Sequence, residues 1–259
     1  EFGAMKYFNE VWTSDNTEAL SRTRIQYGTS LFYPATVMGS HVSATPNHQT
    51  GNITPIKFRF DIACAGRLGM ELQPKRMDDT EKRFARKAVA SYKAYRDIVM
   101  EGDLYRIGTP YDDTGYYGMM YVSKDKKKAV LFTYCIRYQS RTLIPKFRLH
   151  GLDAKTRYTV REQNTDKKRF WFDGGTFTGE YLANAGINPN LSKIYDSAVF
   201  VLEAQAARPD KKGPCRRDFR QGPFFRPLTS GTQRPVYSTA TPRANVRNAS
   251  NSAGEIASG

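Results

Sequence analysis

The feature that most constrains the fold of this chain is a change in the period of its apolar residues near Glu101. Before that residue, extended apolar runs alternate with stretches whose apolar residues recur at helical spacing. After it, short apolar runs follow one another with only turns between them. Alternating strands and helices are typical of a parallel sheet covered by helices, and consecutive short strands are typical of antiparallel sheets. An α/β part followed by an antiparallel β part is therefore expected.

The first part, residues 6–102, is expected to contain three strands and two helices. Strands are expected in "KYFNEVWTS", in part of "TSLFYPATVMGSHVSA" and in "PIKFRFDIACAG". A helix is expected in "NTEALSRTRIQY", ending at Gly28. The clearest helix covers residues 78–102, with acidic residues at its start and Gly102 at its end. Five residues form its apolar face: Phe84, Ala88, Tyr92, Tyr95 and Val99.

The second part, residues 103–205, is expected to be a small antiparallel β-sandwich. One hairpin is expected to pair "YYGMMYVS" with "AVLFTYCIRY", a second to pair "LIPKFRLHG" with "RYTVREQN", and a last strand to follow in "IYDSAVFVLEAQ". The third part, residues 206–259, is basic, rich in Pro, Ser, Gly and Asn, and expected to be disordered. Residues 1–5, "EFGAM", resemble a cloning scar.

The formal net charge of +15 raises the question of nucleic-acid binding. From Ala204 to Gly259 there are ten Lys/Arg and three Asp/Glu, and the rest of the excess is spread over the preceding part of the chain. No base-reading module accompanies this charge, so specific nucleic-acid binding is not expected.

Membrane insertion is not expected either, because no run approaches the roughly 18 apolar residues of a membrane span. Cys64 and Cys135 lie in apolar runs and are expected to be buried free thiols, which favours a reducing compartment such as the cytoplasm.

Asp15 is the candidate catalytic residue. It lies in "EVWTSDNTEAL", between an expected strand and an expected helix, with Glu18 three residues later. This spacing is typical of a capping box at a helix start. Two features favour chemistry instead: Trp12 suits stacking on a sugar, and catalytic residues gather where parallel barrel strands end. From the residues alone, a helix cap and a catalytic acid both stay open, and composition favours the cap.

A second dense stretch is "MGSHVSATPNHQTG", which contains His41 and His48. The two histidines are not at helical spacing and no third ligand is evident, so no metal site is expected. The stretch is either an ordered polar loop or a wall of an active-site mouth. The glycines of "FDGGTFTGEY" open no helix after a buried strand, so a phosphate loop is not expected. His150 is expected at a surface turn.

Four motifs in order, W-T-S-D-N-T, I-Q-Y-G-T-S, G-S-H-V-S-A and P-N-H-Q-T, resemble the C-terminal barrel segment of glycoside hydrolase family 36, the larger microbial α-galactosidases. The resemblance continues through "YKAYRDIVMEGDLYRI", "LHGLDAKTRYTV" and "FTGEYLANAGI", which are similar to the small C-terminal β domain of that family. It covers residues from about Lys6 to Gln205.

The resemblance implies strands 6–8 of a (β/α)8 barrel and a retaining hydrolase of terminal α-linked galactose, acting on oligosaccharides or galactomannans without a cofactor. Asp15 takes the place of the family's general acid/base, with Ser14 and Asn16 orienting it. Trp12 and His41 are the further candidates for contact with the galactose-containing substrate. The parent protein is expected to be a homo-oligomer.

The chain departs from the family in one respect. The family's nucleophile lies in a K-W-D motif well before the acid/base, and this chain has no such motif; "WFD" at residues 171–173 comes too late. The chain is therefore expected to be an inactive fragment, unless another carboxylate such as Asp61 takes that role. Two alternatives stay open: a non-catalytic carbohydrate-binding or assembly module, and an α-N-acetylgalactosaminidase of the same family.

Overall fold

The computed structural model describes residues 2–139 and 143–206. The expected disordered tail, except for its first residue, and Cys215 within it, lie outside the described residues. Helices and strands follow in this order: η1 (Phe2–Lys6), α1 (Ala19–Thr29), η2 (Ala35–Val37), β1 (Gly39–Ser43), α2 (Ile56–Ala63), β2 (Arg67–Glu71), η3 (Pro74–Arg76), α3 (Asp79–Glu101), β3 (Asp103–Gly108), β4 (Tyr116–Val122), β5 (Lys128–Cys135), β6 (Arg157–Gln163), β7 (Thr176–Thr178), α4 (Gly179–Asn184) and β8 (Asp196–Ala204).

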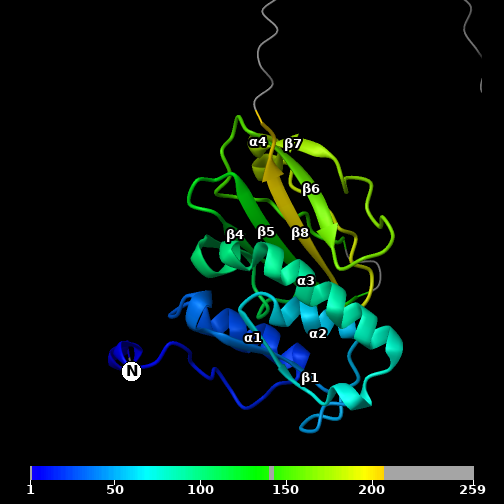
Figure 1. The fold of residues 1–259 in the computed structure, drawn as a ribbon. Coiled ribbons are helices and arrows are strands. Elements are labelled where there is room, and N and C mark those ends of the chain that lie inside the picture. Colours follow the sequence, from blue (N-terminus) through cyan, green and yellow to red (C-terminus); the bar gives the residue numbers. More distant parts are fainter. Residues whose placement is uncertain (1, 140–142, 207–259) are drawn as a thin grey trace, which may run out of the picture. The chain divides into compact units, whose positions relative to one another are not determined.

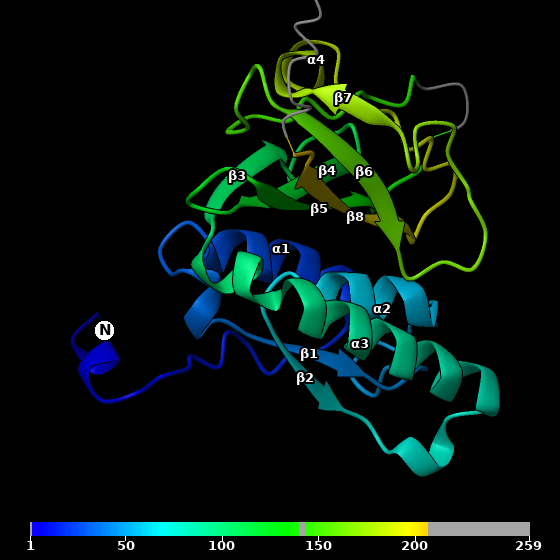
Figure 2. The ribbon, with the colours of Figure 1, turned by 45° about the horizontal axis from the view of Figure 1, so that its top comes forward.

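The elements form layers (Figures 1 and 2). Strands β1 and β2 pair in parallel, and α1, α2 and α3 lie between this pair and a six-stranded antiparallel sheet. The order of that sheet is β3-β4-β5-β8-β6-β7. A mixed α/β fold with an antiparallel sheet, as the sequence predicts, is confirmed.

The antiparallel part is one sheet in the described chain, not the expected sandwich of two. Side chains alternate along its strands between two hydrophobic clusters. On one face, Tyr121 and Phe132 pack with Tyr95 of α3 and other helix residues. On the other face, Met120 and Phe200 pack with Leu182 of α4 and with loop residues. Helices and loops thus cover both faces, which leaves no face for a second sheet.

Helix α3 confirms the expected helix over residues 78–102. Asp78 caps it by accepting from the Glu81 amide at 2.8 Å, and Gly102 is the C-cap. Four of the five expected apolar positions are buried; the fifth, Phe84, is partly buried. The first helix also forms, but it runs past Gly28 to Thr29.

The expected strand "PIKFRFDIACAG" is wrong, because residues 56–63 form helix α2. The run is buried from Phe58 to Ala63. A helix covered on almost every side loses the polar face that gives helical periodicity, so its sequence resembles that of a buried strand. The parallel strand of this region, β2, lies just after it in residues 67–71.

Two further expected strands are wrong. In "KYFNEVWTS" only Val11 forms a bridge, to Met38, and Tyr7 and Phe8 are exposed. In "LIPKFRLHG" only Phe147 does so, with Ile187. The partners of β6 in the sheet are β8 and β7. The segment "FDGGTFTGEY" does lead into a strand and a helix, the short β7 and α4.

Candidate functional site

Asp15 lies where parallel segments end. Val11 forms a parallel bridge to Met38 beside β1, and β1 pairs in parallel with β2. The segments that follow Val11 and β1 therefore emerge at the same edge, which is the edge where α/β proteins place their sites. A contact confirms that they meet: the Gln49 side-chain amide donates to the Asp15 carbonyl at 2.9 Å.

The Asp15 carboxylate is exposed to solvent. One oxygen, Oδ1, accepts a hydrogen bond from the indole N–H of Trp12 at 2.9 Å. The other oxygen has no hydrogen-bond partner among the described residues. A carboxyl group that is oriented on one side and open on the other can exchange a proton with a bound molecule or with water.

The cap of α1 is Glu18, so the capping role expected for Asp15 is wrong. The Glu18 carboxylate accepts from the backbone N–H groups of Leu20 at 3.0 Å and Ser21 at 2.8 Å. Glu18 is 1% exposed, and the helix begins at the next residue. A glutamate takes the cap because the chain enters the helix three residues later than the capping-box pattern predicts.

Gln49 is a site residue that the sequence analysis named only as a letter of P-N-H-Q-T. Its side-chain nitrogen donates to the Asp15 carbonyl, and its side-chain oxygen accepts from the Thr17 amide at 3.3 Å. The side chain therefore holds the loop of Asp15 at two points. Ser14 and Asn16 bond to the backbone, accepting from the amides of Asn16 and Glu18, so they shape the loop without touching the carboxylate.

Trp12 and His41 lie together beside Asp15. Their ring centroids are 4.3 Å apart and the rings are tilted by 44°. Trp12 is 51% exposed, so much of its surface is open. His41 pairs with Gly69 across the β1–β2 register, and a side chain at position 69 would overlap the imidazole. The glycine therefore lets the ring lie against the strand.

The surroundings of His41 are charged. Burial and then the Arg22 guanidinium lower the pKa of His41, while Glu71 and Glu10 oppose this shift. Arg22 is 2% exposed and donates to the Gly39 carbonyl at 2.6 Å. Burial lowers the pKa of Arg22 to about 10, so the guanidinium stays protonated at neutral pH and favours the neutral imidazole.

A metal site finds no support in the described residues, which hold no group of three or more His, Cys, Asp or Glu side chains suited to an ion. His48 is exposed on the loop after β1, and His150 is exposed in the β domain. Cys64 and Cys135 are buried and free, as the sequence predicts. Within the part of the chain that the structure describes, no helix has the length and apolarity needed to cross a membrane.

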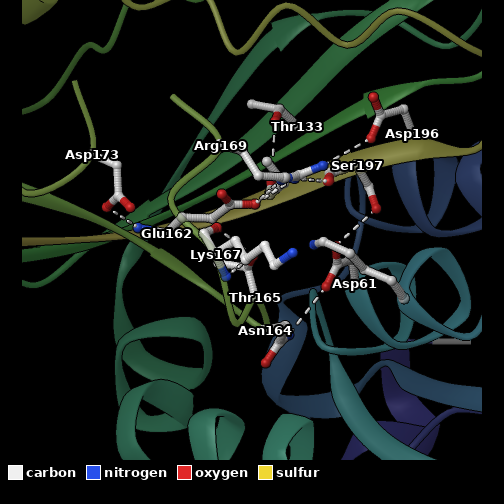
Figure 3. A network of polar contacts seen from close by, with 12 residues as sticks. Asp61, Thr133, Glu162, Asn164, Thr165, Lys167, Arg169, Asp173, Asp196 and Ser197 are labelled. Carbon is white, nitrogen blue, oxygen red and sulfur yellow. Dashed lines mark hydrogen bonds and ion pairs between the residues drawn. The ribbon is translucent and has the colours of Figure 1, made fainter. Parts of the chain in front are cut away.

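Asp61 is fully buried and committed to structural contacts (Figure 3). Its carboxylate contacts the Lys57 ammonium at 2.5 Å. It also accepts from Asn164 at 3.1 Å, after β6, and from the Ser197 hydroxyl at 2.8 Å, in β8. These donors join α2 to the antiparallel sheet. A carboxylate enclosed in this way has no access to a sugar, so Asp61 is no substitute for a nucleophile.

A second ion pair extends this polar network in Figure 3. Glu162 of β6 is buried and pairs with Arg169, which also contacts Asp196 at 3.1 Å. Burial raises the pKa of Glu162, and Arg169 opposes the shift. The network joins α2 to the antiparallel sheet, and none of its residues contacts the Asp15 carboxylate.

Two family models match the chain. Residues 1–102 match melibiase, and residues 116–202 match the C-terminal domain of glycosyl hydrolase family 36. The chain is 37% identical over 205 residues to probable α-galactosidase C of Aspergillus flavus and 38% identical over 205 residues to α-galactosidase 2 of Hypocrea jecorina. Each match covers 78% of this chain and 26% of the relative, so the chain spans about a quarter of their length.

The structure is similar to a substituted form of the family 36 α-galactosidase AgaA from Geobacillus stearothermophilus, solved in complex with raffinose. The TM-score is 0.71 at 35% identity, covering 78% of this chain and 27% of the other. The matched segments include both the Asp15 loop and the antiparallel sheet, and each comparison gives the same family. The chain therefore belongs to glycoside hydrolase family 36, whose named relatives are α-galactosidases.

Proposed function

We propose that this chain is the C-terminal part of a retaining α-galactosidase and that Asp15 is its general acid/base. The observation that carries this proposal is the geometry of Asp15: an exposed carboxylate at the end of parallel segments, held by the Trp12 indole on one oxygen and open on the other. In the first step such a group protonates the leaving oxygen of the glycosidic bond. In the second it takes a proton from the water that releases the sugar.

Trp12 and His41 are proposed to shape the sugar site beside Asp15. Trp12 offers exposed ring surface, and its N–H fixes the orientation of the acid. His41 has a lowered pKa and is therefore neutral near pH 7, so its ring nitrogens are able to donate to one sugar hydroxyl and accept from another. Gln49 is proposed to hold the acid loop in place through its two backbone contacts.

The nucleophile is proposed to lie in a part of the parent protein that this chain does not contain. Retaining hydrolysis needs a second carboxylate about 5–5.5 Å from the acid. Asp61 is enclosed by its donors, and the chain spans about a quarter of its relatives. The substrate is proposed to be a galactose-containing oligosaccharide, since substituted forms of the similar AgaA were solved with raffinose and with stachyose.

The test is Asp15→Ala in the complete parent protein. We expect kcat/KM for raffinose, a poor leaving group, to fall by about 10²–10⁴-fold, because protonation by a positioned acid contributes that much. For an aryl α-galactoside with an acidic phenol as leaving group, kcat/KM should change far less, because that bond breaks without a proton. Added azide should raise the turnover of the aryl α-galactoside by Asp15→Ala, because azide replaces water in the step that releases the sugar and needs no base.

The control is Asp97→Ala, which removes an exposed carboxylate from α3. It should leave kcat/KM for both substrates unchanged. If Asp15→Ala also keeps the parent's rate on raffinose, Asp15 has no part in the mechanism and the proposal is wrong.

A further inference from the structure

Three aromatic side chains form an exposed corner on the β domain. Trp171 follows β6, Phe177 lies in β7 and Tyr181 lies in α4. Trp171 is 73% exposed and Tyr181 is 42% exposed, while Phe177 packs against the cluster on the sheet face that is turned away from α1, α2 and α3. We call these three residues the aromatic corner.

The rings of the aromatic corner stand in two planes. Phe177 and Tyr181 are nearly parallel, with centroids 5.3 Å apart and an interplanar angle of 18°. Trp171 is almost perpendicular to Phe177, at 5.9 Å and 87°. It also contacts Phe172, which is 1% exposed and part of the core. The corner is therefore anchored to the core from below and open to solvent above.

Two glycines lie in the loop beside the rings. At Gly175 an added Cβ would lie 2.9 Å from ring carbons of Phe177, so only glycine lets the loop lie against that ring. Gly174 is exposed and no atom lies within 4 Å of the Cβ position it lacks. The loop between Trp171 and β7 thus adds no side chain at these two positions.

Trp171 and Tyr181 keep much of their surface outside the packing of the described chain. A buried tryptophan or tyrosine normally pairs its polar atom with the protein. Here neither the Trp171 indole N–H nor the Tyr181 hydroxyl has a hydrogen-bond partner among the described residues. Large aromatic side chains left open with free polar atoms point to a ligand.

The ligand that fits this surface is a neutral sugar ring. A pyranose has an apolar face of C–H groups that stacks on an aromatic ring, and its edge carries hydroxyls that bond to polar atoms in the ring plane. The free indole N–H of Trp171 and the free hydroxyl of Tyr181 are polar atoms of this kind. Glu180, next to Tyr181, is exposed with no ion-pair partner in the described part of the chain, so an anionic ligand would be repelled.

The size of the aromatic corner favours a sugar over a protein partner. Three aromatic side chains bury about 150–250 Å² each at most. Part of this surface is already covered by the core, so what remains is smaller than the roughly 800 Å² that one partner contributes to a stable protein interface. It is enough for one or two sugar rings.

We infer that the aromatic corner is a second carbohydrate-binding surface, separate from Asp15, which holds a neutral glycan by stacking. The choice of a galactose-bearing glycan as the probe rests on the proposed function, but the surface itself does not. Such a surface keeps a polymeric substrate on the protein between cleavage events.

Fluorescence tests the inference directly, because Trp12 and Trp171 are the chain's two tryptophans. In the full chain carrying Trp12→Phe, Trp171 is the only indole. Titration with galactomannan should give a saturable change in its emission. The additional change Tyr181→Ala should weaken binding at least about tenfold. The matched control Tyr138→Ala removes an equally exposed ring of the β domain, 43% against 42%, and should leave binding unchanged.

A second measurement needs no tryptophan signal: the mobility of the Trp171→Ala chain in a native gel that contains galactomannan, where binding to the polymer retards the protein. Circular dichroism and melting of each variant establish that it is folded. If folded Trp171→Ala is no longer retarded while Asp15→Asn still is, the inference is supported. This holds even if the parent does not hydrolyse α-galactosides. No saturable change in Trp171 emission in the Trp12→Phe chain, or equal retardation of Trp171→Ala and the unsubstituted chain, overturns it.

Discussion

At the scale of single residues, the neighbouring carboxylates of Asp15 and Glu18 differ in burial and in the number of hydrogen bonds they accept. Glu18 is buried and accepts from two backbone amides and the Ser21 hydroxyl. Asp15 is exposed, and its carboxylate accepts from one side chain, Trp12. Because Glu18 satisfies the first amides of α1, the helix start does not need Asp15. The acid is therefore free to change its protonation state without a cost to the helix.

Substitutions at these two positions should separate stability from chemistry. Glu18→Ala should lower the free energy of unfolding by about 0.5–2 kcal/mol, the usual value of an N-cap. Asp15→Ala should change it by less than about 0.5 kcal/mol, as for other exposed positions. Urea unfolding of both variants, compared with the unsubstituted chain, measures the difference. Equal losses for the two variants would restore Asp15 as the cap.

His41 should make stability depend on pH. Its pKa in the folded chain is below the ordinary value, through burial and the charge of Arg22, against which Glu71 and Glu10 act. The unfolded chain therefore binds the proton more readily, and the free energy of unfolding falls as the pH drops below about 6.5. His41→Gln should flatten this fall between pH 7 and 5 in thermal melts. His48→Gln, at an exposed loop position, is the control, and an equal effect there would contradict the assignment.

At the scale of elements, α2 connects the two kinds of architecture. Phe58 and Phe60 of α2 pack in the hydrophobic cluster. The Asp61 carboxylate accepts hydrogen bonds from β8 and from the segment after β6. The exposed pair of Lys87 and Asp166 also joins a helix, α3, to that segment. The junction therefore contains the Lys57–Asp61 pair, whose carboxylate is buried, and the exposed Lys87–Asp166 pair.

The Lys57–Asp61 and Lys87–Asp166 pairs should differ in their contributions to the free energy of unfolding. Asp61→Ala leaves the partly buried Lys57 ammonium, an amide and a hydroxyl without their acceptor, and should cost about 3–5 kcal/mol. Asp166→Ala removes an exposed pair and should cost at most about 1 kcal/mol. Denaturant unfolding of both variants measures this. If Asp61→Ala costs no more than Asp166→Ala, then hydrophobic packing alone holds α2 on the sheet.

The helices also show which elements a local sequence pattern predicts correctly and which it does not. Helix α3 has one exposed face and both caps in its sequence, so its limits follow from residues such as Asp78 and Gly102. Helix α2 has apolar residues on several sides, and the tertiary burial that explains them is not visible in a local pattern. At the site, the motif around Asp15 predicts the acid. The contacts of Gln49 and Arg22 join segments up to 34 residues apart, so no local spacing indicates them.

At the scale of the whole molecule, the proposed acid Asp15 has no proposed nucleophile among the described residues. The described part has two parallel strands, β1 and β2, with the Val11 bridge beside them. The chain spans about a quarter of its family 36 relatives. If the rest of the site lies elsewhere in the parent protein, then the antiparallel domain and the Asp15 loop form a folded unit that binds but does not cleave.

The purified chain should therefore not hydrolyse α-galactosides. Loss of one member of a catalytic unit typically lowers the rate by several orders of magnitude, and under the proposed function the missing member is the nucleophile. The measurement is release of the phenol from an aryl α-galactoside, with the same chain carrying Asp15→Asn as the control for contaminating activity. The two preparations should be indistinguishable. Robust hydrolysis that is lost in Asp15→Asn would mean that a carboxylate of this chain acts as nucleophile, and Asp61→Asn would then show whether the enclosed network opens to provide it.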